Sequence, residues 1–208
     1  MARATEHGRP ILAPPRDFVV AARATMGGVD LAPWTTADNN RLIESAHIYD
    51  GEHLDFTDLL SRPWEAPRSK RILLYPYLSV QDCRRLINKT LREYRQGSIS
   101  QACVCLPQNE SILKLPWIWD FPVCIPFKRL RPSYWDDELE RFVSVSPANW
   151  SLIFYLPPCQ TPDDYLHSTV RFHRAFAGMG RIIVNENAGE DDWAEAYHNA
   201  IGTPYSYR

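Results

Sequence analysis

Residues 71–77, which read Arg-Ile-Leu-Leu-Tyr-Pro-Tyr, constrain the fold more than any other part of the sequence. The apolar residues predict a short buried strand, and the aromatic-Pro-aromatic sequence predicts an abrupt turn at its end. An amphipathic helix is predicted directly afterwards, from Ser79 to about Arg95, because apolar residues recur at helical spacing. A strand that ends in a turn and leads into a helix places that turn at the carboxyl edge of an α/β sheet, where open α/β folds form their binding sites.

The other segments also alternate between strand and helix patterns. Strands are predicted at residues 29–32, 47–50, 102–106, 122–127, 150–156 and 181–184, and helices at residues 15–26, 35–45, 161–177 and 191–200. Pro33 is expected to end the first strand, and residues 58–64 are expected to form a loop. The predicted class is therefore α/β, with a mostly parallel central sheet and flanking helices.

The length of 208 residues suits one α/β domain with a sizeable core. Residues 1–14 combine mixed charge with Gly8, Pro10 and Pro14, so they are expected to form a mobile N-terminal arm. Residues 15–208 are expected to form a single domain.

Composition argues against several classes of protein. The formal net charge of −2 gives no overall basic field of the kind that announces nucleic-acid binding. No apolar run reaches the roughly 18 residues of a membrane span, and the polar first ten residues predict no secretion signal. The five cysteines are therefore expected to be reduced, mostly buried thiols of a cytoplasmic protein. No His or Cys spacing predicts a metal site.

Several short motifs, taken in order, resemble the phage-type DNA N-6-adenine methyltransferase (Dam-like) family. Residues 29–34 (Val-Asp-Leu-Ala-Pro-Trp) are similar to the family's Phe-x-Leu-Asp-x-x-Ala, and residues 58–64 (Asp-Leu-Leu-Ser-Arg-Pro-Trp) to its Asp-Gly-Leu-x-x-x-Trp. Residues 74–77 (Leu-Tyr-Pro-Tyr) occupy the place of its catalytic Asn-Pro-Pro-Tyr. The likeness covers about residues 15–158 and leaves residues 159–208 as a C-terminal extension. It implies a Rossmann-like methyltransferase fold.

The resemblance also implies a cofactor site for S-adenosylmethionine. Asp30 and Asp58 would accept hydrogen bonds from the ribose and the adenine of the cofactor, and Trp34 would pack on it. The alternatives are that both carboxylates cap loops and that the indole fills the core. If the site is intact, Asp30, Asp58 and Tyr75 should surround one cavity at the carboxyl ends of the strands.

The catalytic turn departs from the family at its reacting position. Leu74 stands where the family has the Asn that accepts a hydrogen bond from the target amine, and Tyr75 replaces the first Pro. A Leu side chain accepts nothing, so adenine methylation is expected to be lost or altered. Tyr75 and Tyr77, on either side of Pro76, could stack on a flipped base or could simply pack at the sheet edge. Leu74→Asn combined with Tyr75→Pro would restore the family pattern and, if the cofactor binds, should raise methyl transfer.

A basic segment offers contacts for DNA phosphates, which fix position without reading sequence. The candidates are Lys128, Arg129 and Arg131, together with Arg68, Lys70 and Arg71. Two functions stay open. One is an S-adenosylmethionine-dependent DNA methyltransferase with an altered catalytic turn, in the cytoplasm of a bacterial host cell. The other is a non-catalytic nucleic-acid-binding or protein-binding module that keeps the fold.

Overall fold

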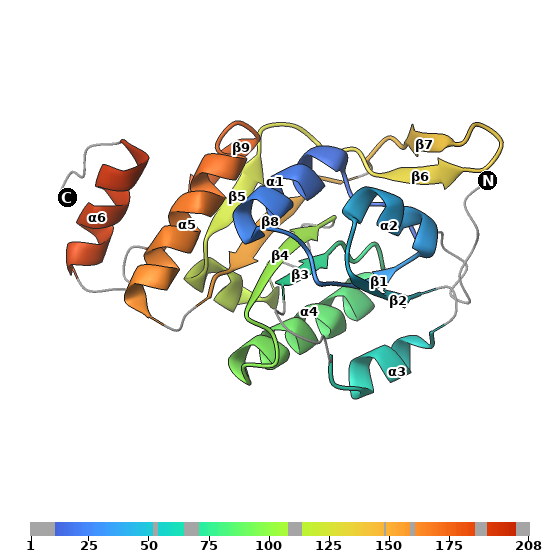
Figure 1. The fold of residues 1–208 in the computed structure, drawn as a ribbon, viewed down its shortest axis with the longest axis horizontal. Helices are drawn as coiled ribbons and strands as arrows, with labels where there is room; N and C mark the ends of the chain where they lie inside the picture. The colour runs from blue at the N-terminus through green and yellow to red at the C-terminus, as the bar shows by residue number, and fades with distance from the viewer. Residues whose placement is uncertain are drawn as a thin grey trace.

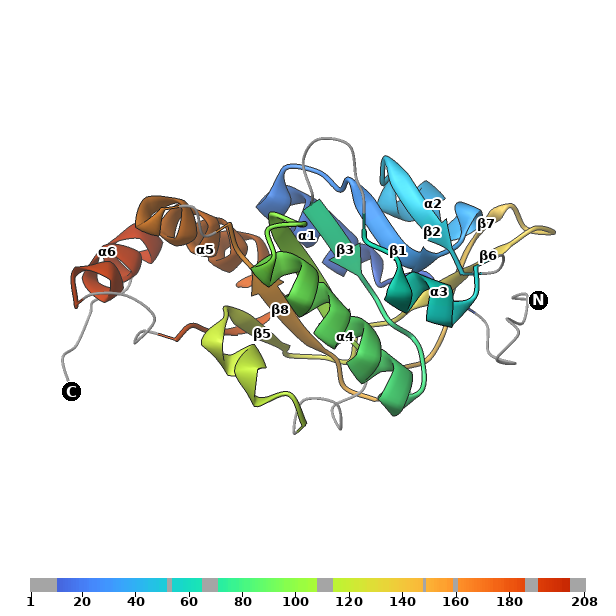
Figure 2. The same ribbon diagram turned by 90° about the horizontal axis from the view of Figure 1, so that it is seen from below.

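A seven-stranded sheet with helices on both faces forms the centre of the protein (Figure 1, Figure 2). The structure is a computed structural model of the chain. It describes residues 11–51, 54–64, 71–107, 114–147, 149–158, 161–185 and 191–202. The predicted α/β class with a mostly parallel sheet and flanking helices is confirmed at this level.

The strands lie in the order β2-β1-β3-β4-β8-β5-β9. Their bounds are β1 Leu31–Thr35, β2 His47–Asp50, β3 Arg71–Leu74, β4 Gln101–Leu106, β5 Val123–Pro126, β8 Leu152–Leu156 and β9 Gly180–Ile183. The four strands from β2 to β4 are parallel neighbours. β8 runs antiparallel to β4 and β5, and β9 runs antiparallel to β5, so only β8 and β9 oppose the other five strands. β1 pairs with β3, at Leu31 and Ile72, as the alternation of strands and helices and the order of the family motifs predict.

Two helical layers cover the sheet. α1 (Arg16–Met26), α2 (Ala37–Ile43) and α5 (Pro162–Phe176) supply the core on one face. α3 (Phe56–Ser61), α4 (Val80–Arg95) and the 3-10 helix η2 (Pro116–Asp120) supply it on the other. α6 (Asp191–Ile201) packs on the outer side of α5 (Figure 1). β6 (Ser133–Asp136) and β7 (Arg141–Ser144) form a separate hairpin.

The alternation of side chains along β4 shows how one strand serves both cores. Ala102, Val104 and Leu106 face the layer of α3 and α4, whereas Cys103 and Cys105 face the layer of α1 and α5. All five are fully buried. A strand covered on both faces is apolar at nearly every position. β4 and β8 fit this pattern apart from Gln101, whose side-chain oxygen accepts a hydrogen bond from the hydroxyl of Tyr155.

The predicted helix starts are confirmed by their caps. The hydroxyl of Ser79 accepts a hydrogen bond from the backbone N–H of Asp82, 3.1 Å away, at the start of α4. Thr36 caps α2 and Thr161 caps α5 in the same way, through the backbone N–H three residues further on. Each cap satisfies one of the amide groups that a helix leaves unpaired at its first turn.

Three local predictions are wrong. β1 does not end before Pro33 but continues to Thr35, because β1 pairs with β3 only at Leu31 and no ladder with β3 needs the missing N–H of the proline. Residues 56–61 form α3 rather than part of the loop expected at residues 58–64; Asp55 caps this helix through the N–H groups of Thr57 and Asp58. The hairpin β6–β7 has no counterpart among the predicted strands, since its four-residue strands begin and end with polar residues and are partly exposed.

Residues 11–14 belong to the folded domain rather than to a mobile arm. Leu12 and Ala13 are buried, and Ala13 pairs with Ser133 through two backbone hydrogen bonds of 2.7 and 3.1 Å. The backbone carbonyl of Ile11 accepts a hydrogen bond of 3.0 Å from the side chain of Asn39. The first ten residues of the predicted arm lie outside the described residues. At the other end of the chain, β9 of the predicted extension is a strand of the central sheet.

Candidate functional site

The candidate site lies where the chain changes direction across the sheet. From β1 the chain passes to β2 on one side and then returns to β3 on the other side of β1. Open α/β folds bind ligands outside the carboxyl ends of the strands at such a switch point. β1 ends there at Thr35, β2 at Asp50 and β3 at Leu74, followed by the turn at residues 75–78.

The turn after β3 is closed by its own hydrogen bonds. The backbone N–H of Tyr77 donates to the carbonyl of Tyr75, and the N–H of Leu78 donates to the carbonyl of Pro76, both at 3.0 Å. Tyr75 stands at the position of the family's first Pro, and its carbonyl already accepts one hydrogen bond within the turn.

The two tyrosines of the turn pack on each other. The ring centroids of Tyr75 and Tyr77 are 6.3 Å apart and the rings are 25° from parallel. Tyr75 is 7% exposed, so a base cannot stack on it without rearrangement of the turn. Burial, with smaller contributions from the neighbouring Cys105 and Tyr77, raises the pKa of the Tyr75 phenol well above its usual value. Tyr75 is therefore a neutral, packed side chain at physiological pH.

Leu74 is a core residue. Its side chain is fully buried in the cluster that β3 shares with α4, alongside Ile72 and Leu86. The side chains of the flanking residues, Leu73 and Tyr75, belong to the cluster on the opposite face. The position that carries the family's catalytic Asn is thus occupied by an apolar side chain that does not line the cavity described below.

Asp30 lies at the wrong edge of the sheet for the predicted cofactor site. It precedes β1, and its carboxylate binds Arg71 at the start of β3: Nη2 donates to Oδ1 at 2.7 Å and Nε donates to Oδ2 at 2.9 Å. The backbone N–H of Arg71 also donates to Oδ2 at 2.9 Å. Tyr75 comes four residues later along the strand direction, or roughly 13 Å away. The expectation that Asp30 and Tyr75 surround one cavity is therefore wrong.

Trp34 does lie at the predicted edge, at the carboxyl end of β1. Its φ of 59° is in the left-handed region, which costs a residue with a side chain about 1 to 3 kcal/mol and is common at functional sites. The indole is 4% exposed and meets the ring of Phe56 edge-on, at 5.1 Å between centroids. Asp58, the third predicted cofactor residue, lies exposed in the first turn of α3 and does not line the cavity beside Trp34.

Asp50 is a candidate that does not emerge from the sequence motifs. It is the last residue of β2, it is half-buried, and it pairs in register with Thr35 at the end of β1. In Rossmann-like folds an acidic residue in this place binds ribose hydroxyls. The pattern that could have identified it is an acid at the end of the second predicted strand, followed by Gly51.

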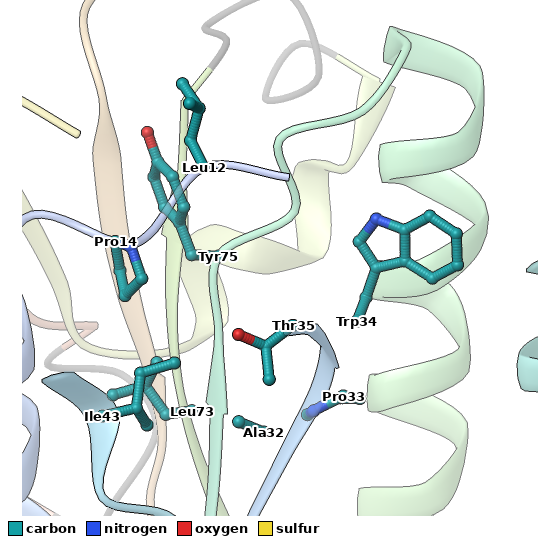
Figure 3. Close-up of a pocket in the computed structure, with 9 residues that line it drawn as sticks. All are labelled: Leu12, Pro14, Ala32, Pro33, Trp34, Thr35, Ile43, Leu73 and Tyr75. Carbon is teal, nitrogen blue, oxygen red and sulfur yellow. The ribbon is translucent and has the colours of Figure 1, made fainter. Parts of the chain in front are cut away.

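A small cavity lies between β1, the turn after β3 and the N-terminal segment at residues 11–14. Figure 3 shows Leu12 and Pro14 beside the side chain of Tyr75, and all three line the cavity together with Thr35. Its volume is about 10 Å³, the space of about one water molecule. Pockets for ligands of cofactor size measure roughly 300 to 1,000 Å³. The cavity that these residues line is too small for S-adenosylmethionine.

The basic segment follows β5 at the same carboxyl edge of the sheet. Lys128, Arg129 and Arg131 are exposed, and the buried Leu130 anchors the segment in the core. Arg71, by contrast, is held by Asp30 at the amino edge, and Arg68 and Lys70 lie outside the described residues. Three of the six predicted phosphate contacts are thus available as a group.

Within the part of the chain that the structure describes, no group of His, Cys, Asp and Glu side chains could hold a metal ion. In the same part, no helix is both long enough and apolar enough to cross a membrane. When compared with protein-family models, curated proteins and solved structures, the chain matches none of them.

Proposed function

We propose that this protein is a non-catalytic descendant of the Rossmann-like methyltransferases, similar to the phage-type DNA N-6-adenine methyltransferases, and that it acts by binding nucleic acid. The observation that carries the proposal is Leu74, an apolar core side chain at the position of the catalytic Asn. Without a polar acceptor at this position, nothing orients the target amine or takes up its developing charge.

The strand order supports the methyltransferase-like ancestry. Open α/β folds place their ligand sites at a switch point of a mostly parallel sheet. Here β1 and β3 flank such a switch point, and β8 is an antiparallel strand inserted between β4 and β5. The turn that resembles the catalytic motif directly follows β3, beside the switch point.

The closed cavity supports the loss of the cofactor. Leu12 and Pro14 cover the ends of β1 and β3, and this cover is fixed by the bridge between Ala13 and Ser133. A cofactor could enter this cavity only if this segment were displaced, which would expose buried apolar side chains at a cost of about 25 cal/mol per Å². The cavity that the described residues form here is therefore too small for S-adenosylmethionine.

The exposed cations support nucleic acid as the partner. Lys128, Arg129 and Arg131 form no ion pair among the described residues. They follow β5 at the carboxyl edge, where the ancestral enzymes would receive DNA. Contacts of this kind depend steeply on salt because each neutralised phosphate releases a counterion.

A second candidate function is an S-adenosylmethionine-dependent enzyme with a changed target. Two observations favour it: Asp50 ends β2 where a ribose would be bound, and Trp34 is strained at the neighbouring end of β1. This function requires the segment at residues 11–14 to open.

Calorimetry separates the two functions. We expect no heat of binding when S-adenosylmethionine or S-adenosylhomocysteine is titrated to millimolar concentration, and no transfer of labelled methyl groups to DNA. Measurable binding that weakens about tenfold in Asp50→Asn, through loss of a charge-assisted hydrogen bond, would establish the second function instead. Asp58→Asn is the matched control, because this carboxylate is exposed on α3 and does not line the cavity.

A further inference from the structure

Large apolar side chains remain exposed at the β5 end of the sheet. Phe127 is 68% exposed and Trp150 is 41% exposed, and Ile125 and Ile183 are exposed to a similar extent as Trp150. A monomeric protein rarely leaves such side chains together in contact with water unless they form an interaction site.

The strand registers place these side chains on one face. β5 pairs with β8 at Val123 with Phe154 and at Cys124 with Ile153. Phe127 directly follows β5 and Trp150 lies two residues before β8, so an extension of this register beyond the paired residues would set them opposite each other. Residues opposite each other in antiparallel strands point to the same face. On the other side of β5, the N–H of Phe127 donates to the carbonyl of Met179 at 3.0 Å.

The pairing of β5 with β9 places side chains of β9 on the same face. Ile125 pairs with Arg181, and Val123 pairs with Ile183. Because residues two apart in a strand share a face, Ile125, Phe127, Arg181 and Ile183 all point to the side on which Val123 joins the core of α4. The β5–β9 face comprises Ile125, Phe127, Trp150, Arg181 and Ile183.

The helical layer on this side stops short of the β5–β9 face. Figure 2 looks onto this side: α4 crosses the sheet, and β5 is drawn to one side of α4 next to η2. η2 has five residues, too few to cover two strands. On the opposite side α5 covers the same strands, where Cys124 and Ile182 are packed in the core.

Three cationic residues belong to the segments that form this face or directly follow them. Arg181 lies within the β5–β9 face, and Lys128 and Arg129 directly follow Phe127. Within the described ranges of the chain, these three side chains form no ion pair with a carboxylate. The face therefore combines stacking surfaces with unneutralised cations.

We infer that the β5–β9 face binds single-stranded nucleic acid, with bases on Phe127 and Trp150 and phosphates at Lys128, Arg129 and Arg181. Open sheet faces with exposed aromatic rings bind single strands in this way, because every unpaired base offers a flat face. A duplex cannot use the rings, since its bases are already stacked on their neighbours. The inference rests on the proposed nucleic-acid-binding function and adds the surface and the strand form.

The test is fluorescence anisotropy on the full chain with a labelled oligothymidylate of about 12 nucleotides, within the range of known single-strand sites. We expect Phe127→Ala and Trp150→Ala each to weaken binding about 5- to 150-fold. Both side chains are exposed, so the fold should persist, which circular dichroism would verify. Leu139→Ala, at the exposed tip of the β6–β7 hairpin, is the matched control and should leave the affinity unchanged.

The charge contribution is tested separately. The double variant Lys128→Gln with Arg129→Gln should reduce the slope of log affinity against log salt by about 1.4, or roughly 0.7 for each phosphate that the protein no longer neutralises. Arg95→Gln, an exposed cation at the end of α4, should leave the slope unchanged.

Three outcomes would overturn the inference. If duplex DNA binds as tightly as the single strand and the aromatic variants bind normally, the rings take no part, although nucleic-acid binding itself stands. If neither nucleic acid binds at about 50 mM salt, where electrostatic contacts are strong, the proposed function fails as well. The face would then suit a protein partner. If both variants and Leu139→Ala weaken binding equally, the effect is not specific to the face.

Discussion

The two edges of the sheet use their polar groups in opposite ways. At the amino edge, the guanidinium of Arg71 forms a bidentate ion pair with the carboxylate of Asp30. The same carboxylate accepts a hydrogen bond from the backbone N–H of Arg71, and Nη1 of Arg71 donates to the carbonyl of Gly27 at 2.7 Å. At the carboxyl edge, Trp34 and Tyr75 are buried and pack on other rings. An ion pair therefore stabilises the amino edge, which has no binding role in open α/β folds. Apolar packing fills the carboxyl edge, where such folds bind their ligands.

This difference shows that a shift of one position along a strand can change the role of a residue. The resemblance places an acid beside Leu31, and the chain has one, but before the leucine rather than after it. At the start of a parallel strand, that residue lies at the amino edge and meets Arg71. The same residue type thus becomes a structural clamp instead of a ligand for a cofactor.

The largest effect should come from placing the family's residue at the carboxyl edge. Leu74→Asn removes an apolar side chain from the core and buries an amide among Ile72 and Leu86, so it should lower the free energy of unfolding by about 3 to 5 kcal/mol. Leu74→Met preserves volume and should cost less than about 1.5 kcal/mol. Urea denaturation, followed through the transition midpoint, measures both.

This outcome bears on the restoration that the sequence suggests. If Leu74→Asn destabilises the core as expected, then Leu74→Asn with Tyr75→Pro should not gain methyl transfer, because the amide faces the core. A loss below about 1 kcal/mol would mean that the side chain can turn toward the cavity, and the contrast between the two edges would be weaker than described.

The next effect should come from the amino edge. Asp30→Asn keeps the shape of the side chain but removes the charge that Arg71 contacts, and both side chains are largely shielded, at 15% and 26% exposed. We expect a loss of about 1.5 to 3 kcal/mol in the free energy of unfolding. Asp38→Asn is the matched control: its pair with Arg41 is exposed on α2, and such pairs contribute about 0 to 1 kcal/mol.

A normal stability for Asp30→Asn would undo the assignment of Asp30 as a structural clamp. Loss of nucleotide or S-adenosylmethionine binding in a variant of normal stability would go further, since it would return Asp30 to the ligand role that the resemblance implied. Urea denaturation and calorimetry on the same protein preparation distinguish the two results.

The elements that the sequence predicts well are those with complete local patterns. β3 and α4 have the expected bounds, because an apolar strand, a Pro turn and a Ser N-cap follow one another within residues 71–79. The pairing of β1 with β3 follows from the alternation of strands and helices and from the order of the family motifs. Thr161 and the acids after it mark the start of α5 correctly.

The errors arise where tertiary context decides. Pro33 suggests a strand end, yet β1 continues because this position needs no hydrogen bond to β3. The β6–β7 hairpin has a charged tip and little apolar alternation, so its sequence does not predict strands. Contacts with Ala13 and α2 hold it in place. The cover of the cavity by residues 11–14 likewise depends on a bridge across more than a hundred residues, which no local pattern encodes.

For the site, the sequence identifies the turn but not the direction of its side chains. Leu74 and Tyr75 are adjacent, and the pleat of β3 sends them to opposite faces, Leu74 toward α4 and Tyr75 toward α1. Asp50 escapes sequence reasoning because its role depends on β2 lying beside β1, which is a property of the sheet order. Lys128, Arg129 and Arg131 are exposed, and their use as phosphate contacts stays a prediction.

The smallest effect should be on the pH dependence of stability in alkaline solution, where variants at the two edges should behave differently. The pKa of Tyr75 is raised mainly by burial, so above about pH 10 the unfolded chain loses this proton before the folded protein does. The contribution of Tyr75 to stability is therefore complete below about pH 10 and falls as the pH rises further, by at most about 1.4 kcal/mol per pH unit. Tyr75→Phe should show a shallower fall in the urea midpoint between about pH 10 and pH 11 than the unmodified protein.

The amino edge supplies the control: the carboxylate of Asp30 raises the pKa of Arg71 further above its already high value, so Arg71 stays charged in this range and Asp30→Asn should keep the unmodified slope. Equal slopes for Tyr75→Phe and the unmodified protein would mean that the phenol reaches water, and that the carboxyl edge is more open than its packing indicates.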